Sequence, residues 1–226
     1  MSQEPFGGDK KVGPASIFGP LERRAIDWTV PKLPKWMTSA RLTMTTVLWS
    51  LMIVLGSFLA EHMNIHWLWL VSATVLMQYI TDSLDGSLGK YRGEGLVRWG
   101  YYMDHFLDYI FLCSIIVGYG FFLPDDQKYL LFFVFALLTA FMVNAFLAMA
   151  ATNKFRITHM GIGPTEIRLL FIVINTLIML FGKTHVAFLL PYVLGLSLLG
   201  LLYLVYTTQK EIWAMDMQVL KTKKDL

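Results

Sequence analysis

Long apolar runs separated by short polar connections dominate the chain. Six runs approach the length of about 20 apolar residues that a helix needs to cross a bilayer. They cover residues 42–60, 65–81, 99–123, 129–151, 166–181 and 185–207. The runs are continuously apolar, without the roughly ten-residue alternating segments of a membrane β-barrel. The pattern therefore predicts an all-α, polytopic membrane helix bundle with about six transmembrane helices.

The two ends of the chain differ from this apolar part. Residues 1–41 are mostly polar, and within them residues 18–37 mix aromatic and aliphatic side chains with basic ones. This mixture is typical of a segment that lies in the membrane interface, although Pro31 and Pro34 should interrupt any helix there. Residues 208–226 have a similar mixture. We predict an interfacial N-terminal segment, 1–41, a six-helix transmembrane domain, 42–207, and an amphipathic tail, 208–226.

Composition excludes several other classes of protein. Hydrophobic residues make up 56% of the chain and charged residues 15%, whereas a soluble domain has roughly a quarter charged residues. Too few charges are present to cover a surface that faces water. The single cysteine, Cys113, cannot form an internal disulfide bond. The basic residues are scattered between apolar runs, so we expect no nucleic-acid partner.

The placement of lysine and arginine predicts the orientation in the membrane. Of these 19 residues, 17 lie in the N-terminal segment, in or beside the second-to-third and fourth-to-fifth connections, or in the tail. The other two, Lys128 and Lys183, lie in the remaining connections. Because basic residues concentrate on the cytoplasmic side of membrane proteins, we expect both termini to be cytoplasmic. This arrangement also requires an even number of spans.

Four carboxylates lie where a membrane helix should be apolar. Asp82 and Asp85 end the second predicted span, and Asp104 and Asp108 lie in the cytoplasmic half of the third. Ionisable groups are costly in a membrane and therefore mark functional sites. Side chains three or four residues apart on a helix differ in direction by only about 60° or 40°, so the two carboxylates of each pair point the same way. Oxygen ligands of this kind suit Mg²⁺ or Mn²⁺, and four carboxylates can hold two such ions.

Glycines accompany the carboxylates. Gly100 precedes Asp104 by one helical turn, and Gly86 and Gly89 lie where we expect the second helix to end. A glycine lets a neighbouring helix or a ligand approach the backbone closely. Two alternatives to a catalytic site are helix caps with interhelical hydrogen bonds, and a divalent-cation transporter. A transporter needs polar groups through the outer halves of the spans, which have few of them.

These residues form a motif that resembles the signature of the CDP-alcohol phosphotransferase (CDP-alcohol phosphatidyltransferase) family. The family pattern is D-x-x-D-G-x-x-A-R, a spacer, and G-x-x-x-D-x-x-x-D. The residues of this chain that match it are Asp82, Asp85, Gly86, Gly100, Asp104 and Asp108. Gly89 and Lys90 replace the alanine and arginine, and the spacer of nine residues is one longer than usual, with the extra residue assigned to the loop 93–95.

Two weaker similarities lie outside this motif. Residues 39–43 resemble the family's entry to the first helix but lack its proline and asparagine. Thr165 and Glu166 are similar to the Thr-Glu pair of choline and ethanolamine phosphotransferases.

The resemblance implies an integral membrane enzyme of phospholipid synthesis. Such an enzyme transfers a substituted phosphate group from a CDP-linked alcohol to an acceptor hydroxyl and releases CMP, with Mg²⁺ or Mn²⁺ as cofactor. The acceptor is a lipid or a polar alcohol. Either a CDP-headgroup reacts with diacylglycerol, towards which the Thr-Glu pair leans slightly, or CDP-diacylglycerol reacts with a polar alcohol. The family also implies a homodimer, while the distribution of lysine and arginine places the active site on the cytoplasmic side of the bilayer.

The resemblance further assigns roles to residues of this chain. Asp82, Asp85, Asp104 and Asp108 are expected to be metal ligands, and Asp108 is also the expected general base. The residues assigned to the CDP group are Thr43, Gly86, Gly89, Lys90 and Gly100. Four basic residues on the same side are candidate contacts for an anionic substrate, or else ordinary positive-inside residues: Arg98, Lys154, Arg156 and Arg168.

Overall fold

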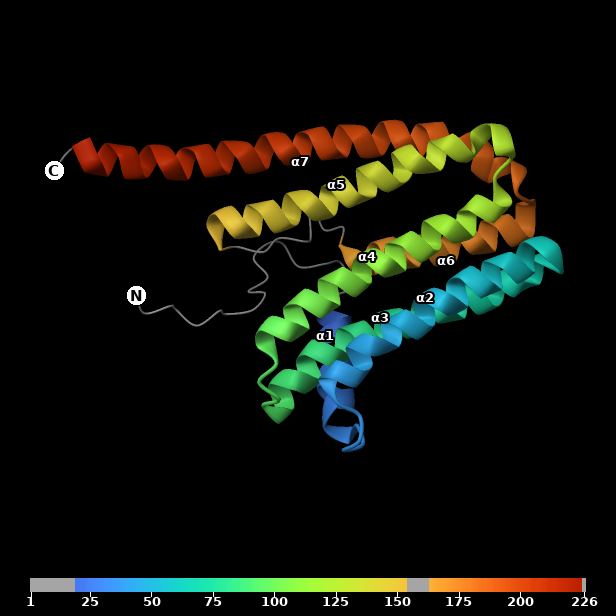
Figure 1. Cartoon of the computed structure of the whole chain (residues 1–226), viewed down its shortest axis with the longest axis horizontal. Helices are drawn as coiled ribbons and strands as arrows, with labels where there is room; N and C mark the ends of the chain where they lie inside the picture. The colour runs from blue at the N-terminus through green and yellow to red at the C-terminus, as the bar shows by residue number, and fades with distance from the viewer. Residues whose placement is uncertain (1–18, 154–162, 225–226) are drawn as a thin grey trace.

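The computed structural model describes residues 19–153 and 163–224, and all regular structure in these ranges is helical (Figure 1). The helices are α1 (Gly19–Thr29), α2 (Ser39–His62), α3 (Leu68–Arg92), α4 (Val97–Phe122), α5 (Lys128–Thr152), α6 (Pro164–Phe181) and α7 (Thr184–Lys224). Short 3₁₀ turns occupy Val30–Lys32, Ile65–Trp67 and Asp125–Gln127. From α2 to α7 successive helices run in opposite directions, which confirms the predicted all-α bundle.

Within the described ranges, five helical segments are long and apolar enough to cross a membrane. They are Ser39–His62, Val97–Phe122, Asp125–Thr152, Pro164–Phe181 and Phe188–Lys223. The remaining predicted span, 65–81, corresponds to α3, which is 25 residues long. It is less apolar because its second half carries Asp82, Asp85, Lys90 and Arg92. The apolar helices make this an integral membrane protein.

The end of α3 corrects one expectation. The helix does not end at Gly86 or Gly89 but continues through both to Arg92. A glycine inside a helix costs about 1 kcal/mol relative to alanine, but Leu84 and Leu88 bury their side chains in this stretch and hold it in place. Gly93 then ends the helix in the left-handed region, with φ of 63°, and Gly95 also has positive φ, 73°. Helix α3 therefore ends at the loop 93–95, to which the extra spacer residue was assigned.

Helix α7 is much longer than its predicted span. It has 41 residues and continues past residue 207 to Lys224. At a rise of 1.5 Å per residue this corresponds to about 60 Å, twice the hydrocarbon thickness of a bilayer. The segment from residue 208 to Lys224, predicted as a separate tail, is therefore a direct continuation of the last helix (Figure 1).

The core of the bundle lies among α2, α3, α4 and α6. α2 packs along α3 and α4, and α3 packs against α6. Small residues allow the close approach: a Cβ added at Gly118 would lie 2.6 Å from the Oγ atom of Ser57, and one at Gly56 would lie 2.9 Å from Cγ2 of Val71. Such contacts between small residues are typical of helix pairs in membranes. The two helices that carry the four aspartates, α3 and α4, are therefore held together through α2.

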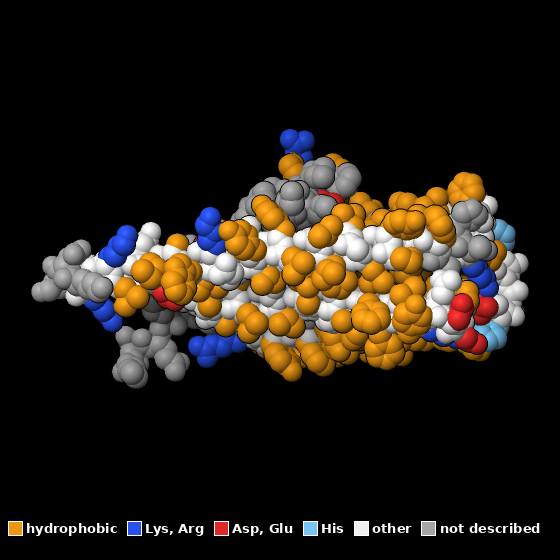
Figure 2. All heavy atoms as spheres, turned by 90° about the horizontal axis from the view of Figure 1, so that it is seen from above, with side chains coloured by type: hydrophobic (Ala, Val, Ile, Leu, Met, Phe, Trp, Pro, Cys, Tyr) orange, Lys and Arg blue, Asp and Glu red, His pale blue; other side chains and the backbone are white. Residues whose placement is uncertain are grey.

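Helices α5 and α7 are more peripheral. They pack chiefly against each other, and large apolar side chains remain exposed on both, among them Phe132, Leu147 and Leu196. Figure 2 shows hydrophobic side chains over the length of this face, with charged side chains gathered towards the two ends. An apolar surface of this extent is suited to lipid or to another membrane helix rather than to water.

The N-terminal segment is attached to the end of the bundle where α3 ends. α1 continues into the 3₁₀ turn that contains Pro31, and Val30 is buried against Leu42, Leu84 and Leu88. The Arg92 guanidinium donates hydrogen bonds to the carbonyl oxygen of Leu33, 2.7 Å, and to those of Pro34 and Met37. The segment 30–37 is thus fixed beside the ends of the helices that carry the aspartates.

Candidate active site

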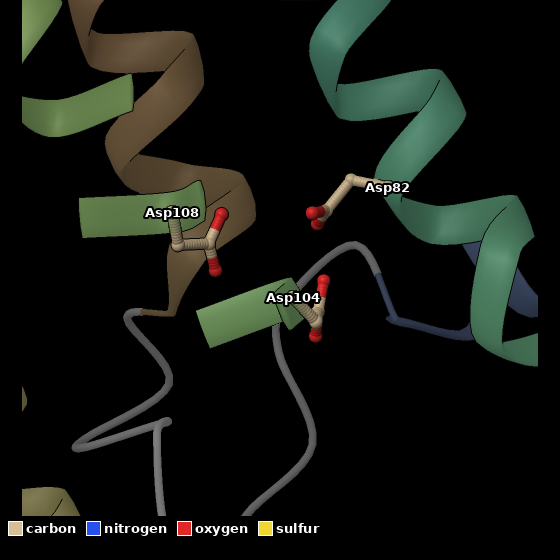
Figure 3. Close-up of side chains that lie close together, drawn as sticks. All are labelled: Asp82, Asp104 and Asp108. Carbon is tan, nitrogen blue, oxygen red and sulfur yellow. The ribbon is translucent and has the colours of Figure 1, made fainter. Parts of the chain in front are cut away.

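Three carboxylates converge where α3 approaches its end and α4 has just begun. Asp82 lies on α3, and Asp104 and Asp108 lie one turn apart on α4. Each offers one oxygen atom, and these three atoms lie within 4.8 Å of one another. Figure 3 shows the three side chains directed towards a common space. The short connection between antiparallel α3 and α4 brings Asp82 level with Asp104 and Asp108.

Asp85 is not a member of this group. It is buried, with 5% of its surface exposed, and its Oδ2 atom accepts a hydrogen bond of 2.6 Å from the Thr43 hydroxyl on α2. Three residues along a helix rotate the side chain by about 60°, which turns Asp85 towards α2 while Asp82 faces α4 and α6. Its role as a fourth metal ligand stays a prediction. Thr43, which was assigned to the nucleotide site, orients this carboxylate.

Arg168 on α6 joins the carboxylates of two helices. Its Nη2 atom lies 2.9 Å from Oδ2 of Asp82 and 2.9 Å from Oδ1 of Asp108. The guanidinium faces the core because Arg168 shares one side of α6 with the buried Phe171 and Asn175. A buried cation compensates carboxylates that would otherwise repel one another in a medium of low dielectric constant.

Arg168 was predicted to contact an anionic substrate or to be an ordinary positive-inside residue, and its pairing with the aspartates was not predicted. A signal was present, since Arg168 is an ionisable residue inside a predicted span, the criterion that singled out the aspartates.

Two further side chains support the aspartates. Gln78, fully buried one turn before Asp82, donates a hydrogen bond of 3.3 Å from Nε2 to Oδ1 of that residue. The His105 ring packs between Tyr101 and Phe146, and its Nδ1 atom lies 3.8 Å from Oδ2 of Asp104. Gln78 was not considered in the sequence analysis. Its position four residues before Asp82 on a membrane helix was the available signal.

The glycines of the motif have different surroundings. A Cβ added at Gly86 or Gly100 would meet no described atom within 4 Å. A Cβ added at Gly89 would lie 3.1 Å from the Oγ atom of Ser39, so the small size of Gly89 allows the start of α2 to approach α3. Open space for a ligand therefore adjoins Gly86 and Gly100, whereas the space beside Gly89 is taken by α2.

The candidate basic residues divide into three groups. Lys90 and Arg98 are exposed, Lys90 near the end of α3 and Arg98 at the start of α4. Arg92 is half-buried and directed at the carbonyl groups of the N-terminal segment. Lys154 and Arg156 lie outside the residues that the structure describes. Lys90 and Arg98 are thus open to solvent, whereas Arg92 has a structural role.

The start of α6 uses the Thr165-Glu166 pair to fix the helix. The Glu166 carboxylate accepts a hydrogen bond of 2.8 Å from the backbone N–H of Gly163, which caps the helix. The Thr165 hydroxyl donates to Oε2 of Glu22 on α1 at 3.3 Å. Glu166 is not part of the carboxylate group formed by the aspartates. These contacts set where α6 begins and therefore where Arg168 lies.

The donor set fits a divalent cation. All three converging groups are carboxylates, the hard oxygen ligands that Mg²⁺ and Mn²⁺ prefer, and their oxygen atoms lie close enough together for one ion to contact several of them. The polar contacts made by Gln78 and Arg168 restrict the orientation of these carboxylates, as outer-shell groups do in metal sites.

The comparisons with known proteins agree with this geometry. Residues 31–214 match the model of a family described as CDP-alcohol phosphatidyltransferase. The match includes the four aspartates, Thr43 and Arg168, and extends from the end of the N-terminal segment into α7. No curated protein sequence matches the chain.

Proposed function

The chain belongs to the CDP-alcohol phosphatidyltransferase family, and we propose on that basis that it transfers a substituted phosphate group from a CDP-linked alcohol to an acceptor hydroxyl and releases CMP. The observation that carries the proposal is the convergence of Asp82, Asp104 and Asp108, whose oxygens lie within 4.8 Å of one another at the positions of the family motif. Membership in a transferase family favours this function over cation transport.

We assign the metal ligands to the aspartates. Asp82, Asp104 and Asp108 are the proposed core of the site, and Asp85, held by Thr43, is the proposed additional ligand for a second ion. Bound Mg²⁺ or Mn²⁺ would neutralise charge on the diphosphate during transfer. The open space beside Gly86 and Gly100 is where we place the CDP group.

We assign proton transfer to Asp108. In the proposed reaction the acceptor oxygen forms a bond to the phosphorus distal to cytidine, and the bond from that phosphorus to the CMP oxygen breaks. The electron pair leaves with CMP, and the hydroxyl proton passes to the Asp108 carboxylate. A general base must lie within hydrogen-bond reach of the proton that it removes, and Asp108 faces the space shared by the three carboxylates (Figure 3).

The identity of the donor decides between the two branches of the family. The Thr165-Glu166 pair supports a CDP-linked headgroup that reacts with diacylglycerol, with CDP-diacylglycerol and a polar alcohol as the second candidate. Purified protein in detergent should release CMP from one donor class only when the matching acceptor is present. CMP release from neither class with any acceptor would contradict the proposed function.

Lys90 is the proposed contact for the donor diphosphate. Because Lys90 is exposed at the end of α3, whereas Arg92 binds the carbonyl groups of Leu33 and Pro34, Lys90→Ala should raise the donor KM by about tenfold. Lys90→Arg should be tolerated, since an arginine fork still pairs with phosphate oxygens.

Steady-state kinetics of Lys90→Ala, Arg92→Ala and Arg98→Ala test this assignment. Arg92→Ala serves as the structural control and should lower Tm more than it changes the donor KM. A normal KM for Lys90→Ala together with a raised KM for Arg98→Ala would move the phosphate contact to the start of α4.

We propose that the site faces the cytoplasm. The support is the concentration of lysine and arginine in the segments at the end of the bundle where the aspartates lie. Helix α1 and the end of α7 lie towards this end (Figure 1). In a Cys113→Ser background, a cysteine at Asp126 should react with an impermeant thiol reagent in intact cells and one at Lys223 should not; the reverse result would invert the orientation. The exposed apolar faces of α5 and α7 leave room for the homodimer that the family resemblance implies.

A further inference from the structure

Arg168 has no part in the reaction as proposed, yet it lies among the proposed metal ligands. One nitrogen atom, Nη2, contacts both Asp82 on α3 and Asp108 on α4, each at 2.9 Å. The Arg168 side chain is only 8% exposed, and a guanidinium remains charged in proteins. A fixed positive charge is therefore built into the position between two carboxylates.

The surroundings of Arg168 hold it in this position. Farther along the same side of α6, the Asn175 amide donates to the Ser72 hydroxyl on α3 at 3.2 Å and accepts from the Tyr119 hydroxyl on α4 at 3.1 Å. The ring of Phe111 lies 5.9 Å from Cζ of Arg168. Helix α6 is thus tied to the two helices that carry the aspartates, and the guanidinium cannot drift far from them.

The bridging nitrogen and a divalent cation need the same place. Mg²⁺ lies about 2.1 Å from its oxygen ligands, whereas Nη2 lies 2.9 Å from Oδ2 of Asp82 and from Oδ1 of Asp108. Both cannot lie between these two oxygens. In addition, a cation beside a divalent ion is strongly repelled where the dielectric constant is low.

We infer that Arg168 is a resident cation of the carboxylate cluster that competes with the metal. It holds Asp82 and Asp108 together against their mutual repulsion until a divalent ion displaces the guanidinium from at least one of them. Arg168 therefore weakens metal binding but keeps the site assembled. This inference rests on the metal-dependent function proposed above, and Arg168 acts in it as a positioning residue.

Metal binding measured without any CDP donor tests the inference. The full-length protein in detergent is titrated with Mn²⁺, and free Mn²⁺ is followed by electron paramagnetic resonance. Arg168→Gln should bind Mn²⁺ about tenfold more tightly than the wild type, because the competing charge is gone. Arg168→Lys, which keeps the charge on a shorter side chain without the planar guanidinium, should have an intermediate affinity.

Thermal unfolding supplies a second measurement. In chelator, Arg168→Gln should have a lower Tm than the wild type, because the carboxylates lose their compensating charge. Added Mn²⁺ should then raise its Tm by more than it raises that of the wild type. Lys183→Gln is the matched control, since Lys183 pairs with Glu61 at the opposite end of the bundle. It should lower Tm equally in chelator and in Mn²⁺ and leave the Mn²⁺ affinity unchanged.

The possible results separate this inference from the function on which it rests. A wild-type protein that binds no Mn²⁺ contradicts the metal-dependent function and the role of Arg168 with it. A wild-type protein that binds Mn²⁺ while Arg168→Gln binds it equally or more weakly contradicts the role of Arg168 alone. If Arg168→Gln does not fold, Arg168→Lys takes its place. Mn²⁺ binding by Arg168→Lys that is no tighter than that of the wild type would then contradict the role of Arg168.

Discussion

Asp108→Asn is expected to lower the rate of CMP release by about 10²–10⁴-fold, the usual loss when a general base is removed. An amide cannot accept the proton of the acceptor hydroxyl. The fold should survive, because the asparagine carbonyl oxygen can still accept the hydrogen bond that Arg168 donates to Oδ1 of Asp108. The rate is measured at saturating Mn²⁺, so that a weaker metal affinity does not contribute.

Asp125→Asn is the control for this experiment. Asp125 is exposed just beyond the end of α4 that lies opposite the site, and it pairs with Lys128 at 2.6 Å. Its replacement should leave the rate close to that of the wild type. A rate for Asp108→Asn above about a tenth of the wild-type value would assign the base to another group.

Removing divalent cations should abolish CMP release, and adding Mg²⁺ or Mn²⁺ should restore it. The converging groups are all carboxylates, and the single charge of Arg168 does not balance three of them, so without a metal the diphosphate would be repelled. The loss should be reversible, since Arg168 links Asp82 to Asp108 and preserves the arrangement of the site. CMP release is measured before chelation, after it, and after each metal is added back.

The control for chelation is the same protein with chelator already saturated by Mn²⁺, which should remain fully active. Undiminished CMP release after exhaustive chelation would remove the metal from the mechanism. Loss of activity that neither metal restores, together with a lowered Tm, would instead show that the metal is needed for folding.

Local sequence patterns were sufficient for the class of fold and for the carboxylates that converge. The length and spacing of the apolar runs predict the six long helices α2 to α7, because hydrophobicity and helical periodicity are properties of neighbouring residues. The spacing of Asp104 and Asp108 predicts that they share one face of α4, and the structure places them together. The ends of helices were harder to predict. Gly86 and Gly89 disfavour a helix, but the burial of Leu84 and Leu88 outweighs this cost and α3 continues through them.

The residues that each polar side chain contacts depend on how the helices pack. Asp82 and Asp85 are close on α3, yet one meets Arg168 of α6 and the other meets Thr43 of α2. Arg92 is only two residues from Lys90 in the sequence, yet carbonyl groups of the segment 33–37 occupy its guanidinium. Spacing along one helix gives only relative directions, whereas these contacts join residues 42 to 86 positions apart. They arise from the packing of several helices at once, which no single stretch of sequence specifies.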